Sequence, residues 1–168
     1  MYDAKAIETA IVSGLKEYVS AGGRTCEVVL ASQAGPVPKY PYIAYTITTP
    51  VQYRGGTYSE AEDGTKYRPL LQTWSFTAQS DSMDESVETA MRAYDWFAVA
   101  GLTALNDADV VVSSLGNINN RDNLITIQYE YRNGFDVTFR LLHTVEMTDA
   151  ERGGIIETAN IKPTTKEV

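Results

Sequence analysis

The chain of 168 residues has a single cysteine, a single histidine and no long apolar run. A lone cysteine, Cys26, cannot form an internal disulfide, so the sequence does not require an oxidising compartment. A transmembrane helix needs about 20 apolar residues, and no stretch approaches that length. The N-terminal segment carries Asp3 and Glu8 and lacks the basic and apolar regions of a signal peptide. We therefore expect a soluble protein that is made in the cytoplasm.

Basic residues are also scarce. The chain has 14 of them against 22 acidic residues, which gives a net charge of −8 and a pI of about 4.6. A protein that grips nucleic acid needs a basic face to neutralise phosphates. The charge balance argues against such a grip, although DNA can still pass through an acidic lumen without adhering.

Catalytic and metal-binding motifs are missing as well. His143 has no second histidine as a partner, and no G-x-S-x-G, P-loop or dinucleotide motif occurs. The carboxylates at 60–63 and 81–85 lack the spacing of a calcium-binding loop, and a solvated surface explains them. The sequence therefore predicts no catalytic residue, no cofactor and no metal site.

The segment from Arg121 to Met147 predicts two long antiparallel strands. Apolar residues alternate from Ile125 to Tyr131 and again from Phe135 to Leu141, with Asn133-Gly134 between the two sets. A two-residue loop would place the two sets on opposite faces. We therefore predict a three-residue loop, 132–134, with Gly134 left-handed in a G1 bulge.

The remaining patterns predict an α+β domain over residues 1–147. Helices are expected at 3–21, with Asp3 as N-cap, and from a capping box of Ser82 and Glu85 to Gly101. Strands are expected at 26–31, 42–49, 70–79 and 108–115. This order predicts a mainly antiparallel sheet with two helices packed on one face.

Two segments are expected to lie outside this core. Residues 51–69 contain the hairpin signal Asp63-Gly64, which would pair 58–62 with 65–69 in a protruding β-hairpin arm. Residues 148–168 are polar and lose periodicity, so we expect a tail that becomes ordered only when a neighbour receives it. Ile155 and Ile156 are its obvious anchors.

The arm combines aromatic and charged residues. Its three basic side chains, Arg54, Lys66 and Arg68, are balanced by three acidic ones, and Tyr53, Tyr58 and Tyr67 lie among them. Tyrosines interleaved with basic residues can stack on nucleic acid bases, but tyrosine and arginine are also enriched at protein interfaces. The zero net charge favours protein docking. The predicted interface residues are Tyr53, Arg54, Tyr58, Tyr67, Arg68 and Arg121.

Arg121 lies in an asparagine-rich run, 119–123. One interpretation is a binding loop in which Arg121 forms an ion pair with another subunit. The other is a set of Asx-turns that simply separates two strands.

Three segments, 38–50, 73–97 and 117–141, together with the N-terminal helix, resemble the neck or tail-terminator (tail completion) proteins of long-tailed bacteriophages that infect Gram-positive bacteria. The resemblance covers about residues 1–147. It implies a structural virion protein without catalytic residues, which forms a ring, commonly a hexamer. Such a ring caps the tail tube and joins it to the head connector.

Two alternatives to this function remain open. One is a head-completion or stopper protein of the same neck. The other is a small-ligand-binding or enzymatic α+β domain, which would need a deep pocket with convergent polar groups.

Overall fold

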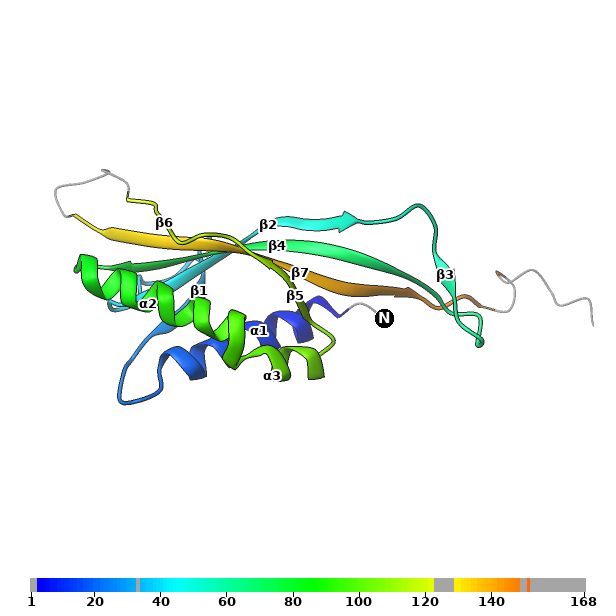
Figure 1. The fold of residues 1–168 in the computed structure, drawn as a ribbon, viewed down its shortest axis with the longest axis horizontal. Coiled ribbons are helices and arrows are strands. Elements are labelled where there is room, and N and C mark those ends of the chain that lie inside the picture. Colours follow the sequence, from blue (N-terminus) through cyan, green and yellow to red (C-terminus); the bar gives the residue numbers. More distant parts are fainter. Residues whose placement is uncertain (1–2, 33, 123–128, 149–150, 152–168) are drawn as a thin grey trace, which may run out of the picture.

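The computed structural model describes residues 3–32, 34–122, 129–148 and 151. Figure 1 shows one long sheet with the helices on one of its faces, which confirms the predicted α+β class. Among the described residues, none of the helices has the length and apolar character that crossing a membrane requires. In chain order the elements are α1 (Ala4–Val19), β1 (Glu27–Leu30), β2 (Tyr42–Tyr53), β3 (Ser59–Glu60), β4 (Lys66–Ser80), α2 (Met83–Asp95), the π-helical turn η1 (Trp96–Ala100), α3 (Leu102–Asp107), β5 (Val111–Leu115), β6 (Asn119–Asn120) and β7 (Tyr131–Val145).

The sheet has the strand order β1-β2-β4-β7-β5, with β3 added to β4 and β6 added to β7. Only the β1–β2 pair is parallel among the described strands. β4 and β7 pair along their whole length, from Lys66 opposite Val145 to Ser80 opposite Tyr131. These two strands run beyond the helices at the end that carries β3 (Figure 1). The sheet therefore has a helix-covered part and an uncovered extension.

The first helix forms as its sequence predicts. The carboxylate of Asp3 accepts a hydrogen bond from the Ala6 amide at 3.0 Å, so Asp3 is the N-cap. Ile11, Leu15 and Val19 recur every four residues and are buried against the sheet. The helix is followed by Gly22, which adopts a positive φ of 78°. A residue without a Cβ adopts that conformation at little cost.

The second predicted helix is interrupted. α2 passes into η1, and the chain continues as α3 beyond Gly101, where the sequence predicts that the helix ends. The indole of Trp96 explains why glycine is needed at this position. A Cβ at Gly101 would lie 2.4 Å from the ring, and a Cβ at Gly14 of α1 would lie 2.7 Å from it. Both glycines leave room for Trp96 between the helices.

The predicted capping box at the start of α2 is wrong. Ser82 makes no side-chain cap hydrogen bond. Ser80 takes the role expected of Glu85: its hydroxyl accepts from the Ser82 amide at 3.1 Å, and it donates to the carboxylate of Glu85. Ser80 is the last residue of β4 and is fully buried. The carboxylate of Glu85 is therefore bound by the last residue of β4 and not by the N-cap residue of α2.

The predicted turn at 132–134 is also wrong. β7 runs without a break through Asn133 and Gly134, which lie opposite Ala78 and Thr77 of β4. Gly134 is not among the glycines with positive φ. A Cβ there would lie 2.5 Å from the carbonyl oxygen of Phe76. Gly134 therefore permits a close approach of two strands.

The chain does fold back before β7, but at a different place. β6 pairs with β7 with Asn119 opposite Gly134, and the Arg121 amide donates to the carbonyl of Arg132 at 2.7 Å. The expected strand positions Ile125 and Ile127 lie outside the described residues. The alternation from Phe135 to Leu141 is confirmed, because Phe135, Val137, Phe139 and Leu141 are all buried on the helix side.

A three-residue turn with a left-handed glycine is found in residues 51–69 instead. Gly64 has a φ of 80°, its amide donates to the carbonyl of Ala61, and the Ala61 amide donates to the carbonyl of Thr65. Ser59 pairs with Tyr67 and Glu60 with Lys66, one residue away from the predicted register. The ends of the segment continue β2 and β4. A protruding arm at 51–69 stays a prediction.

Candidate functional site

One group of functional candidates lies where the sheet extends beyond the helices. Arg68 of β4 lies opposite His143 of β7, while Tyr53 ends β2 and Tyr58 precedes β3. The guanidinium carbon of Arg68 is 4.2 Å from the centre of the Tyr53 ring and 5.7 Å from that of Tyr58. We call Tyr53, Tyr58, Arg68 and His143 the tyrosine–arginine cluster.

Hydrogen bonds fix the geometry of this cluster. Nδ1 of His143 lies 3.2 Å from the hydroxyl of Tyr53 and 3.4 Å from that of Tyr58. Arg68 donates from Nη2 to the carbonyl of Gly55 at 2.7 Å. Tyr53 and Tyr58 remain 41% and 39% exposed, so about two-fifths of each residue is open to a partner. The cluster thus presents preorganised aromatic surface beside a positive charge.

The sequence prediction finds only part of this cluster. It names Tyr53, Tyr58 and Arg68 but leaves His143 without a partner. Arg54 is exposed next to Tyr53, whereas Tyr67 neighbours Arg68 in β4 and so points to the opposite face of the sheet. The pairing of Arg68 with His143 follows from the long β4–β7 ladder, which extends beyond the predicted strand 70–79.

The sixth predicted residue, Arg121, lies on the sheet face that the helices leave open. Its Nη2 donates to Oδ1 of Asp136 at 2.9 Å, and its Nη1 donates to the hydroxyls of Ser75 and Thr77 at 2.5 and 3.1 Å. The carboxylate partner is therefore in the same chain. A role for Arg121 in another subunit's ion pair stays a prediction.

These contacts affect the ionisation of Asp136. Partial burial by itself would raise the pKa of its carboxyl group. The hydrogen bonds from Ser75 and Arg121, together with the positive charge of Arg121, outweigh burial and hold the pKa below its ordinary value of 3.8. The Arg121–Asp136 pair therefore stays charged in any neutral or mildly acidic solution, and it holds the Arg121 side chain, directly after β6, on the open face.

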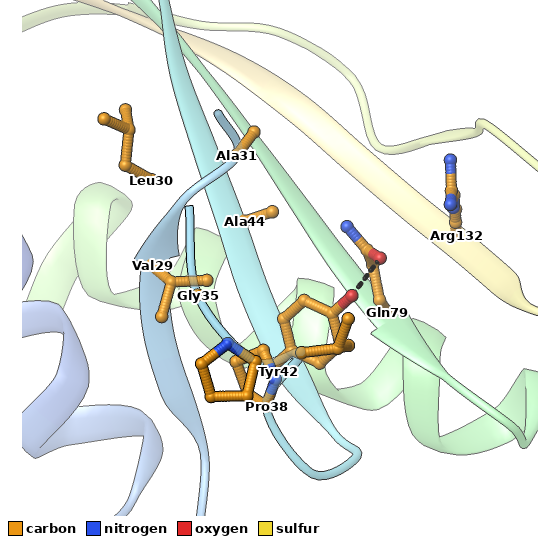
Figure 2. Close-up of a pocket in the computed structure, with 11 residues that line it drawn as sticks. Val29, Leu30, Ala31, Gly35, Pro38, Tyr42, Ala44, Gln79 and Arg132 are labelled. Atoms are coloured by element: carbon orange, nitrogen blue, oxygen red, sulfur yellow. Dashed lines mark hydrogen bonds between the residues drawn. The ribbon is translucent and has the colours of Figure 1, made fainter. Parts of the chain in front are cut away.

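A groove on the same open face was not predicted. The loop that follows β1 passes over the sheet and encloses about 560 Å³. Its walls include Val29 of β1, Pro36, Val37 and Pro38 of the loop, Tyr42 of β2 and Arg132 of β7 (Figure 2). We call this site the loop groove. The prolines predict a loop with extended character, but no local signal places that loop above the sheet.

Polar contacts define one wall of the loop groove. The Tyr42 hydroxyl donates to Oε1 of Gln79 at 2.6 Å, as Figure 2 shows. Burial and the nearby charge of Glu130 raise the pKa of Tyr42 to about 12, so the phenol stays neutral. Glu130 in turn accepts from the guanidinium of Arg132 at 2.6 Å. The groove thus has an apolar loop side and a hydrogen-bonded polar side.

Within the described residues, no three histidine, cysteine, aspartate or glutamate side chains are grouped so that they could hold a metal ion. Cys26 directly precedes β1 and is buried in the core. Burial, with smaller contributions from the charges of Glu27 and Glu85, raises the pKa of its thiol to about 11. This thiol is poorly suited to nucleophilic chemistry, because the reactive species is the thiolate.

The state of Cys26 can be tested with a thiol reagent at neutral pH. A shift of the pKa from 9.0 to about 11 lowers the thiolate fraction about 100-fold, and burial blocks access in addition. We therefore expect 5,5′-dithiobis(2-nitrobenzoic acid) to react at least ~100-fold more slowly with the folded protein than with the protein in urea. Equal rates in the two conditions would show that Cys26 is accessible.

Comparison with known protein families identifies the chain. Residues 9–167 match the family described as phage neck terminator protein. The chain belongs to the phage neck terminator family. Members are structural proteins of the phage neck and not enzymes, which places the chain in the virion. No curated protein matches the chain. The match confirms the resemblance at the level of a phage neck terminator, and it extends past residue 147 to residue 167.

Proposed function

We propose that this neck terminator forms a hexameric ring that caps the tail tube of a long-tailed phage of Gram-positive bacteria. The ring also joins the tube to the head connector. The observation that carries this proposal is the match to the neck terminator family over residues 9–167. The tyrosine–arginine cluster supports it, because exposed tyrosine rings beside an arginine are typical of protein interfaces.

Ring closure requires two different surfaces on each subunit, so that head-to-tail contacts repeat until they close. The sheet offers two such surfaces at its edges. β1 and β5 each have one strand neighbour in the described sheet, so each presents an unpaired edge. The two edges differ in sequence and in position relative to the helices. Joining one edge region to the other in the next subunit produces a heterologous contact.

The tyrosine–arginine cluster is our candidate for the surface that meets the tail tube protein. It lies at the end of the sheet, beyond the helices, and it is partly exposed. Residues 51–69 have no net charge, so the surface is better suited to a protein than to phosphates. The overall charge of −8 would let DNA pass through the ring without specific binding.

Replacing Tyr58 with alanine tests this assignment. A central interface tyrosine contributes about 2 kcal/mol or more to binding, so the Kd for tail tube protein should rise about 30-fold. Tyr58→Ala should leave the fold intact because its ring lies on the surface. The measurement is a titration of immobilised tube protein, together with the length distribution of tubes assembled in the presence of each variant.

Tyr129→Ala is the matched control, because Tyr129 is 55% exposed and lies before the other end of β7. We expect it to bind tube protein like the parent. If Tyr58→Ala binds as tightly as Tyr129→Ala, the cluster is not the tube surface. If the parent binds head connector protein and has no affinity for tube protein, the proposed role changes to that of a stopper.

A further inference from the structure

We propose that the loop groove receives the C-terminal segment of a neighbouring copy of this chain, with Ile155 and Ile156 as its anchors. This inference rests on the proposed ring, because it names a contact that holds neighbouring subunits together. Three observations carry it: the composition of the groove, the composition of the segment, and the distance that separates them along one chain.

The groove suits a short apolar segment. Its volume of about 560 Å³ lies within the range of 300–1,000 Å³ that is typical of sites that bury a small ligand. Val37 on its rim is 73% exposed, so it offers apolar surface that an occupant can cover. Strand β1, which borders the groove, is at the edge of the sheet among the described strands, where an extended segment can pair with it.

The C-terminal segment has a matching sequence. Gly153, Gly154, Ile155 and Ile156 form an uncharged run between Arg152 and Glu157. Glycines allow a backbone to approach another surface closely, and the two isoleucines supply the apolar side chains. The family match continues to residue 167, so this segment is part of the region that defines a neck terminator.

The same chain cannot fill its own groove with these residues. Ala44 of the groove lies level with Gly134, and from Gly134 to Val145 the strand advances 11 residues, which spans roughly 37 Å. From Val145 to Ile156 there are 11 residues, which reach about 40 Å even when fully extended. The hydrogen bond from the Glu151 amide to the Thr148 carbonyl closes a turn, which shortens this reach by about 4 Å, to less than the separation. The occupant must therefore come from a neighbouring subunit.

Disulfide trapping between two full-length variants tests the contact. Val37→Cys, tagged, is mixed with untagged Ile156→Cys under mild oxidation, and the tagged heterodimer is quantified on a non-reducing gel. Cys26 is buried and does not compete. Val99→Cys replaces Val37→Cys in the control, because Val99 is 74% exposed, against 73% for Val37, and lies on the helix side in η1.

We expect the Val37→Cys mixture to give at least about tenfold more heterodimer than the Val99→Cys mixture, because docking raises the local concentration of the two thiols. A synthetic peptide of residues 149–168 should suppress that heterodimer by competing for the groove. If rings assemble but the two mixtures give equal yields of heterodimer, this inference is overturned and the proposed ring is not. A protein that stays monomeric with tube protein present would overturn the proposed ring, and this inference with it.

Discussion

Replacing Gly134 with asparagine should lower the free energy of unfolding by about 2–3 kcal/mol. A side chain at this position meets the carbonyl oxygen of Phe76 at 2.5 Å and Nη1 of Arg121 at 2.9 Å. The first contact is with backbone, so no side-chain rotation relieves it. Either β7 moves away from β4 or the Arg121–Asp136 pair is displaced. Urea denaturation followed by circular dichroism measures the change.

Gly22→Asn is the control that separates the two explanations for a glycine. Gly22 has a φ of 78°, and a Cβ added there would meet no atom within 4 Å. Asparagine tolerates this backbone conformation. We therefore expect Gly22→Asn to lower the free energy of unfolding by less than about 1 kcal/mol. A similarly small loss at Gly134 would instead support a left-handed turn at 132–134 and contradict the continuous strand β7.

The second large effect is expected for Phe97→Ala, which should lower the free energy of unfolding by about 3–5 kcal/mol. Phe97 of η1 has no exposed surface. Its ring centre is 4.8 Å from that of Phe76 in β4 and 5.7 Å from that of Phe139 in β7. Removing the ring leaves a cavity where the π-helical turn meets the sheet, and the surrounding aromatic rings cannot close it completely.

Val99→Ala provides the comparison within the same turn, because its side chain is largely exposed. It should change the stability by no more than about 0.5 kcal/mol. Phe97→Leu keeps most of the side-chain volume, so its loss of stability should lie between those of Val99→Ala and Phe97→Ala. If Phe97→Ala lowers the free energy of unfolding by less than about 1 kcal/mol, the helices are not anchored to the sheet through this ring.

The sequence predicts the layers of this fold well where one periodic pattern decides the structure. The four-residue spacing of Ile11, Leu15 and Val19 identifies α1, and the alternation from Phe135 to Leu141 identifies the buried face of β7. These patterns reflect local geometry, since a helix repeats every 3.6 residues and a strand every two. The α+β class with helices on one face follows from their order.

Contacts between distant residues decide the features that the sequence does not predict. Asn133-Gly134 is a strong local turn signal, yet Gly134 is needed because β4 comes close to it. Arg121 binds Ser75 and Thr77, which lie more than 40 residues earlier in the chain. No local pattern contains that information. Ser80 likewise accepts from the Ser82 amide in place of Glu85, because β4 ends beside the start of α2.

Among the interface candidates, too, some residues are identified by local sequence and others only by contacts between distant residues. Composition singles out Tyr53, Tyr58 and Arg68, because tyrosine and arginine are typical of protein interfaces. The addition of His143 requires the register of β4 against β7, which places it opposite Arg68. The loop groove requires a third kind of information, the path of a proline-containing loop over the open face of the sheet.

The central claim is that this neck terminator acts as a ring through contacts between subunits and with the tail tube. The most direct test is the mass of the assembly, measured by native mass spectrometry for the protein alone and with purified tail tube protein. We expect a closed oligomer, most simply six copies, that is present alone or forms on the tube end. A protein that stays monomeric in both samples and does not bind tube protein would contradict the account.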